Sequence, residues 1–244
     1  MLTLGIDMAA QAKHTGVCAL AWQEGEVHIK TLGVGADDDT LLDAMDQADA
    51  TGIDCPFGWP AAFHQFLEAY TASAKPALGT WSPEVRDRLR FRETDRHVRA
   101  ITGRWPLSVS TDMIAVPTLR LAMLLARLGV WDRSGANGVY EVYPAAVLVR
   151  CGLHTSGYKK AAGKARREEM LASLLARMPW LRLTSAQQEA LTAADDAFDA
   201  FIAALGTRAA TQGLTEPPPP EHAEAAAMEG WIHVPVPDFL AQLL

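Results

Sequence analysis

The sequence predicts a mixed α/β fold, with an antiparallel three-strand meander, additional parallel strands and flanking helices. Three strand-like segments follow one another closely at the N-terminus, and later strand-like segments alternate with helical ones. Hydrophobic residues make up 49% and charged residues 21% of the 244 residues, a composition typical of globular proteins. A chain of this length buries a sizeable core without disulfides. Disordered, collagen-like and disulfide-dense proteins are therefore excluded.

The N-terminal strands are predicted from short-range patterns. Segment 2–7 is an apolar run that ends in an acid, 15–22 is a second apolar run, and 27–34 alternates apolar and polar residues. Because the links between them are short, we expect the three strands to pair antiparallel. A helix is expected over 37–48, behind an acidic start that suits a helix N-terminus, and a fourth strand over 51–55.

The rest of the chain is predicted to be mainly helical. Helices are expected over 60–73, 92–102, 117–129, 144–151, 164–177, 186–208 and 221–228. Two further strands are expected at 138–143 and 231–234, and the proline run 217–220 is expected to form a stiff connector. We therefore predict one domain over 1–244, with a mainly helical insert at about 60–135 and a C-terminal appendage after the connector.

The cysteines and the N-terminus favour a cytoplasmic location. Cys18, Cys55 and Cys151 are far apart and form no CxxC pair, which argues against a zinc knuckle and a disulfide framework. The N-terminus enters a strand pattern without the basic region and cleavage site of a signal peptide. Apolar runs are shorter than the ~18 residues of a membrane span. We expect a reduced compartment and no membrane partner.

The net charge of −7 is the sum of two basic segments and an acidic remainder. Between residues 75 and 104 eight basic residues face four acidic ones, and between 146 and 167 there are six basic residues and no acidic one. Net charges of +4 and +6 in these segments leave −17 for the rest of the chain. This uneven distribution makes nucleic acid a possible partner of an otherwise acidic protein.

Acidic residues occupy strand positions where burial is expected. Asp7 ends the first strand, Asp54 ends the fourth, and Glu141 lies within the strand at 138–143. A buried carboxylate costs several kcal/mol unless it is paired or binds a cation. The ends of parallel strands are also where ligands bind in α/β sheets. The alternative is that Asp54 starts a turn and that Glu141 is a hydrogen-bonded structural acid.

The helix expected at 186–208 adds Asp195, Asp196 and Asp199 in an apolar setting, and which of the three bind metal stays open. Asp196 and Asp199 are three residues apart and therefore project from one face of the helix. If these acids meet the strand acids, carboxylates ~4 Å apart repel by roughly 4 kcal/mol at an effective dielectric constant near 20. Oxygen ligands without histidine or cysteine favour Mg²⁺ or Mn²⁺. Two such ions ~3.5–4 Å apart promote phosphodiester cleavage.

Basic residues supply candidates for substrate binding. Arg92, Arg96 and Arg99 share the helix at 92–102, and arginine binds phosphate bidentately. The alternative is a solvated helix in which Asp95 pairs with an arginine. Lys13 and His14 follow the first acid closely, and His14 suits a proton shuttle, but the pattern favours a surface turn. The basic residues at 159–167 have the same two interpretations, a phosphate contact or a solvated loop.

Several segments resemble known nucleases. LGIDMAAQAKHTGVCAL (4–20) resembles the opening hairpin of ribonuclease H-like nucleases, and DDAFDAFIAAL (195–205) is similar to the last catalytic helix of bacterial Holliday-junction resolvases. GIDCPFGWP (52–60), RETDRHVR (92–99), YEVYPAA (140–146) and EGWIHVP (229–235) resemble the domain-of-unknown-function 429 (DUF429) family of predicted ribonuclease H-like nucleases. The resemblance to this family covers nearly the whole chain.

The resemblance implies a ribonuclease H-like sheet and a metal-dependent nuclease site. It places Asp7, Asp54 and the pair Asp196/Asp199 in metal-binding roles and Glu141 as a further catalytic acid. Where the resolvases usually carry glutamate on the fourth strand, this chain has the shorter Asp54, a difference that bears on the metal spacing.

We therefore predict a Mg²⁺- or Mn²⁺-dependent nuclease that hydrolyses phosphodiester bonds of nucleic acid by a two-metal-ion mechanism. One alternative is a nucleotide phosphoryl-transfer enzyme of the actin-like or sugar-kinase type, but such chains normally duplicate the unit and carry glycine-rich phosphate loops. Another is a non-catalytic nucleic-acid-binding protein on the same fold. The sequence leaves open whether the substrate is DNA or RNA, branched or linear, whether cleavage is internal or terminal, and whether the protein is a homodimer.

Overall fold

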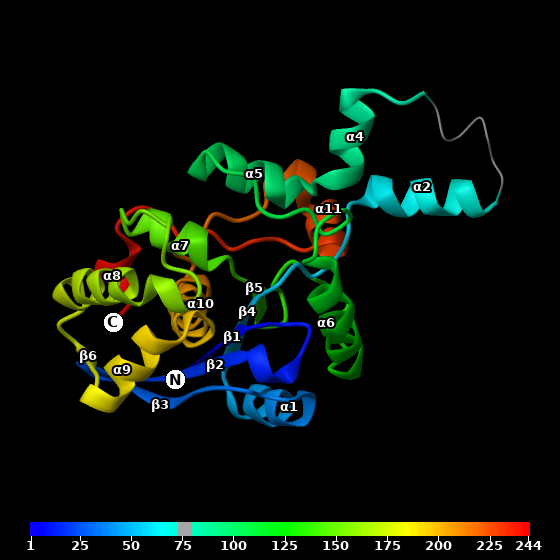
Figure 1. Ribbon diagram of the computed structural model, residues 1–244. Coiled ribbons are helices and arrows are strands. Elements are labelled where there is room, and N and C mark those ends of the chain that lie inside the picture. The colour runs from blue at the N-terminus through cyan, green and yellow to red at the C-terminus, as the bar shows by residue number, and fades with distance from the viewer. Residues whose placement is uncertain (73–79) are drawn as a thin grey trace. The chain divides into compact units, whose positions relative to one another are not determined.

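Six strands form one mixed sheet, ordered β5-β4-β1-β2-β3-β6, in the computed structural model, which describes residues 1–72 and 80–244 (Figure 1). The strands are β1 (Leu2–Asp7), β2 (Gly16–Gln23), β3 (Glu26–Val34), β4 (Ala50–Asp54), β5 (Val139–Glu141) and β6 (Leu181–Arg182). β1, β2 and β3 pair antiparallel, whereas β4 joins β1, β5 joins β4 and β6 joins β3 in parallel. The predicted mixed α/β sheet is confirmed, and it agrees with a ribonuclease H-like fold.

The chain divides into two units. Unit 1 consists of Met1–Cys55, Gly138–Pro217 and His233–Leu244 and contains the sheet, whereas unit 2 consists of Pro56–Asn137 and Pro218–Ile232 and is helical. The expected insert at about 60–135 falls within the first segment of unit 2. The chain after the proline run is shared by the two units. Lys75 and the last residue of the helix expected at 60–73 lie outside the described residues.

One buried helix forms the centre of unit 1. The helices of unit 1 are α1 (Asp38–Gln47), α7 (Pro144–Arg150), α8 (Lys164–Arg177), α9 (Ser185–Ala193) and α10 (Asp195–Thr211), and α10 is the buried one. Every residue from 197 to 205 of α10 is buried, and the helix packs on β1, β2 and β4. Phe198 and Phe201 of this helix lie in the apolar core with residues of the sheet and of α8. The three cysteines are also buried in unit 1, and none forms a disulfide.

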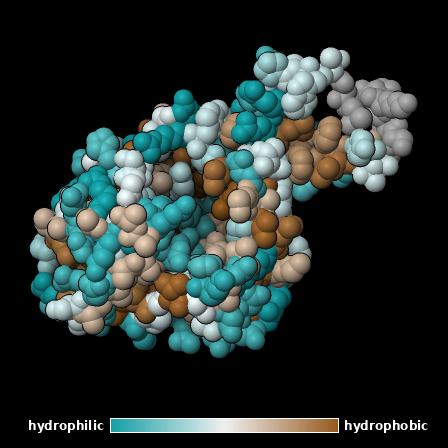
Figure 2. All heavy atoms as spheres, in the orientation of Figure 1, coloured by the Kyte–Doolittle hydropathy of each residue, from teal (hydrophilic) through white to brown (hydrophobic). Residues whose placement is uncertain are grey.

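Unit 2 consists of short helices. They are α2 (Ala61–Thr71), α4 (Pro83–Arg90), α5 (Glu93–Thr102), α6 (Ala115–Arg127) and α11 (Ala223–Glu229). The surface view shows hydrophobic residues over α2 and α6 (Figure 2). On α6, Val116, Leu119 and Met123 are exposed at intervals of three and four residues, so they share one side of the helix.

The structure corrects several expected elements. The helix expected at 186–208 is two helices, because Ala194 takes an extended conformation and α10 begins anew after it. No strand forms at 231–234: Ile232 is a single bridge residue, and the neighbouring Pro235 pairs with Thr215 in an isolated bridge.

Two elements are absent from the sequence prediction. α4 begins with a Ser82 cap followed by proline, a recognisable helix start. β6 has only two residues, too few for a periodic signal. In the described part of the chain, no helix has the length and apolar character that crossing a membrane requires.

Candidate metal centre and its surroundings

The strand register places Asp7 and Asp54 side by side. They are direct partners at the ends of the parallel strands β1 and β4. Paired residues in neighbouring strands direct their side chains to the same face of the sheet, and strands are ~4.8 Å apart. The fold therefore holds two carboxylates at one level of one face.

Glycines allow α10 to approach that face closely. A Cβ atom on Gly5 would lie 2.0 Å from the carbonyl oxygen of Ala200, and one on Gly16 would lie 2.1 Å from that of Asp196. Gly16 is the antiparallel partner of Asp7, so the first turns of α10 pass over the ends of the strands. A larger residue at either position would push away the helix that carries Asp199.

Asp199 completes a group of three carboxylates. One oxygen each of Asp7, Asp54 and Asp199 lies within 4.8 Å of the others. Asp199 is fully buried, whereas Asp7 and Asp54 are partly buried and can be reached from solvent. The three residues come from two strands and a helix that are far apart in the sequence. We call this group the acidic cluster.

Burial raises the pKa of all three carboxyl groups. Loss of hydration is the largest cause for each of them, and together with the neighbouring charges it gives Asp54 a pKa of about 7. The negative charges of Asp199 and Asp54 raise the pKa of Asp7 further, while the positive charge of Lys159 lowers it. Asp54 therefore retains its proton nearly to neutral pH, and a divalent cation that binds its carboxylate must release that proton.

The oxygen-only donor set fits a hard divalent cation. Carboxylates within 4.8 Å of one another can share one ion, and no histidine or cysteine belongs to this group within the described residues. Such ligands suit Mg²⁺ or Mn²⁺ better than Zn²⁺. Metal binding by Asp7, Asp54 and Asp199 stays a prediction, and these are the predicted ligands that the fold brings together.

Asp199 also binds two residues of the loop before α8. The hydroxyl group of Tyr158 donates a hydrogen bond to its Oδ1 over 3.0 Å, and the ammonium group of Lys159 forms an ion pair with its Oδ2. The sequence marked Lys159 only as part of a basic loop and did not identify Tyr158 as a site residue. A Tyr-Lys-Lys run has no periodic signal, so only the folded chain reveals these contacts.

A buried arginine fixes this loop. The guanidinium group of Arg167 is fully buried and donates to the carbonyl groups of Tyr158 and Lys160 and, 2.8 and 3.0 Å away, to those of Thr192 and Ala193. The last two carbonyls belong to the end of α9. Arg167 therefore ties the loop to the helix break that starts α10.

The other predicted acids lie outside the acidic cluster. Glu141 is the register partner of Ile53, so it faces the opposite side of the sheet from Asp54, although its charge raises the pKa of Asp54. Asp196 is partly buried, and burial together with the charge of Asp195 raises its pKa. The side chain of Asp195 accepts a hydrogen bond from the backbone N–H of Lys160 over 3.0 Å.

Lys13 and His14 lie on the 3₁₀ turn Ala12–His14 that follows β1. Both side chains are exposed, as the surface-turn alternative expects. His14 is near enough to Asp196 for its charge to lower the pKa of that carboxyl group. The turn therefore lies in the same unit as the acidic cluster, with a histidine facing the start of α10.

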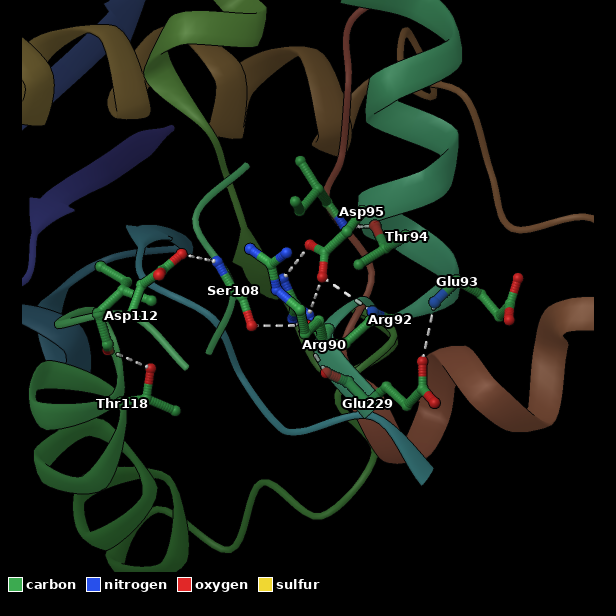
Figure 3. Close-up of polar contacts among 11 residues, drawn as sticks. Arg90, Arg92, Glu93, Thr94, Asp95, Ser108, Asp112, Thr118 and Glu229 are labelled. Carbon is green, nitrogen blue, oxygen red and sulfur yellow. Dashed lines mark hydrogen bonds and ion pairs between the residues drawn. The ribbon is translucent and has the colours of Figure 1, made fainter. Parts of the chain in front are cut away.

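The predicted arginines belong to unit 2, and their surroundings differ. Arg92 is buried and forms an ion pair with Asp95 at 2.9 Å, and it also donates to the carbonyl group of Glu229 over 3.0 Å (Figure 3). This corrects the expected phosphate contact of Arg92, whose guanidinium is engaged inside the unit. Arg96 binds the carbonyl group of Asp87 over 3.0 Å.

Arg99 differs from the other two arginines because it is exposed. Its guanidinium lies 5.9 Å from the ring centre of Trp105, a cation–π arrangement. The same unit contains a carboxylate that sequence reasoning missed. Glu229 accepts hydrogen bonds from the first amides of α2 and α5, those of Ala61 at 2.7 Å and Glu93 at 3.0 Å, and so caps both helices.

One comparison with known proteins gives a match. The model of a family described as "Protein of unknown function (DUF429)" matches residues 5–224. No curated protein and no solved structure matches the chain. The matched range includes all three members of the acidic cluster and the loop that binds Asp199.

Proposed function

We propose that this chain, which belongs to the DUF429 family of proteins of unknown function, is a metal-dependent nuclease that hydrolyses phosphodiester bonds of nucleic acid. The observation that carries the proposal is the convergence of Asp7, Asp54 and Asp199 within 4.8 Å. Three carboxylates in a partly desolvated position repel one another strongly, and the fold maintains them at a cost that a bound cation offsets. This arrangement supports a site for Mg²⁺ or Mn²⁺.

The residues of the site divide into ligands and supports. Asp7, Asp54 and Asp199 would hold the cation, which when bound supplies a Lewis acid that activates water and stabilises the leaving oxygen. Tyr158 orients Asp199 through its hydroxyl group. Asp7 and Asp54 are only partly buried, which supports access of a substrate to the site.

Positive charge beside the acidic cluster supports a phosphate-containing substrate. Lys159 and Lys160 are exposed on the loop of unit 1 that reaches Asp199. Lysine binds phosphate as a point charge. Because such contacts read the backbone and not the bases, they favour nucleic acid without selecting DNA or RNA.

Cleavage assays with a ligand variant test this function. We expect the wild type to cleave at least one of labelled duplex DNA, branched DNA, single-stranded DNA and RNA with Mg²⁺ or Mn²⁺, and EDTA to abolish cleavage. Asp7→Asn should reduce the rate by more than ~100-fold, because even the outer partners of metal ligands contribute ~10–100-fold.

Asp43→Asn provides the matched control, since Asp43 is an exposed acid of α1 outside the acidic cluster. It should cleave at the wild-type rate. The proposal fails when no substrate is cleaved with either metal, or when Asp7→Asn retains the wild-type activity.

A further inference from the structure

The three ligands of the acidic cluster have different protein partners. Both oxygens of Asp199 accept from the loop, one from Tyr158 and the other from Lys159. Among the described residues, no side chain donates a hydrogen bond to the carboxylate of Asp7 or Asp54. One carboxylate is thus already paired with a cation of the chain itself, and the other two are available to an added ion.

The charges of the group suit one divalent cation. Three ionised carboxylates and one ammonium group carry a net charge of −2, which a single Mg²⁺ or Mn²⁺ neutralises. Counted over these four groups alone, a second divalent ion would leave a surplus of +2 in a partly desolvated site, where uncompensated charge is costly.

Hydrogen bonds fix the backbone before and after Lys159. The carbonyl groups of its neighbours Tyr158 and Lys160 both bind Arg167, and the backbone N–H of Lys160 binds Asp195. Lys160 is kept at a φ of 63°, which a residue other than glycine seldom adopts. The Lys159 side chain remains 50% exposed while Asp199 is 0% exposed, so the ammonium group meets both the buried ligand and solvent.

We propose that Lys159 takes the place of a second metal ion, so that the acidic cluster binds one divalent cation beside a fixed ammonium group. This inference rests on the proposed nuclease function and replaces the two-ion arrangement expected from the sequence. Asp7, Asp54 and Asp199 would hold the ion. Lys159 keeps Asp199 in position and presents positive charge to the phosphate of a substrate.

Metal stoichiometry tests the inference without any need for activity. Mn²⁺ is titrated into the full chain at constant pH and ionic strength, and the free ion is measured by electron paramagnetic resonance. We expect one Mn²⁺ per wild-type chain and two per Lys159→Met chain, because the variant loses the competing charge at Asp199. Lys159→Arg should bind one ion, since it retains the charge.

Lys160→Met is the matched control, because it removes the same charge from the neighbouring exposed position. It should bind one ion like the wild type. Two ions in the wild type, or one ion in a folded Lys159→Met, overturn the inference. The wild-type measurement alone decides it when the variant does not fold.

The two proposals fail separately. A chain that binds one ion, gains a second in Lys159→Met and cleaves no nucleic acid supports the role of Lys159 and overturns the nuclease function. A chain that cleaves nucleic acid while binding two ions supports the nuclease function and overturns the role of Lys159.

Discussion

At the scale of single residues, the raised pKa of Asp54 makes the stability of the protein depend on pH. This pKa is raised to about 7, because burial and the charges of Asp199 and Glu141 raise it by more than the charge of Lys159 lowers it. An aspartate in the unfolded chain has a pKa of about 3.9. Between these two values the folded protein keeps a proton that the unfolded chain has lost. Its stability is therefore greatest below this interval and falls as the pH rises through it.

We expect the free energy of unfolding of the metal-free wild type to fall by about 2 kcal/mol between about pH 5 and about pH 8. Asp54→Asn should make this decrease in the free energy of unfolding smaller, because the amide does not titrate. Part of the decrease should remain, because Asp7 and Asp199 still titrate. Urea unfolding at a series of pH values measures the difference. Mn²⁺ should stabilise the wild type most at the higher pH, where the carboxylates are ionised. A wild-type stability that rises over this interval contradicts the prediction.

The sequence identifies the members of the acidic cluster better than their partners. Asp7 and Asp54 are recognisable because each acid closes an apolar strand, and Asp199 because it interrupts an apolar helix face. Glu141 looks equivalent, but strand register decides which face it occupies, and register depends on pairing between distant segments. The contact of Lys159 with Asp199 depends on a loop conformation that Arg167 maintains, and local sequence does not encode it.

At the scale of elements, the packing of α10 on β1 determines whether the acidic cluster forms. The backbone of α10 occupies the space where a side chain on Gly5 would lie, with the nitrogen of Ala204 only 2.3 Å from the position of its Cβ atom. Backbone atoms in two packed elements cannot move aside as a flexible side chain can. The separation of helix and sheet is therefore fixed by the absence of a side chain.

Gly5→Ala should destabilise the protein by about 3 kcal/mol or more, because added volume in a packed core displaces whole elements. Gly33→Ala is a suitable control, since Gly33 lies in β3 and its Cβ atom would meet nothing within 4 Å. This control should be neutral or stabilised by up to ~1 kcal/mol. Chemical denaturation of both variants measures the two effects. Equal stabilities would show that α10 does not approach β1 so closely.

Element prediction succeeded where patterns are local. The strands of the meander and the helix behind the acidic start at 37–48 carry clear periodicity and capping signals. The break at Ala194 is marked only by the acids that start α10, Asp195 and Asp196, and the alanines around it favour a continuous helix. The buried Arg167 binds the carbonyl groups at this break, so a tertiary contact and not local propensity accounts for it.

At the scale of the whole molecule, the C-terminal segments complete both units. Glu229 caps two helices of unit 2, and Phe239 lies fully buried in the core of unit 1. Neither unit is therefore a continuous piece of chain.

A chain that ends at Pro217 should lose stability in both units, because it removes the caps of α2 and α5 together with part of the sheet's core. Hydrogen exchange followed by mass spectrometry should show faster exchange at the starts of α2 and α5 and in β1. Glu229→Gln provides the comparison: it changes the caps alone and should speed exchange in unit 2 without affecting β1. Full protection of unit 1 in the shortened chain contradicts the prediction.

The placement of the cysteines offers a natural reporter of how the sheet opens. All three thiols are buried in unit 1 and unit 2 contains no cysteine. Burial raises the pKa of Cys151 to about 12 and that of Cys18 further, so both remain protonated and unreactive while the fold is intact. The rate at which a thiol reagent alkylates the native chain therefore measures the opening of unit 1. Unit 2 has no cysteine to react, so no engineered label is required.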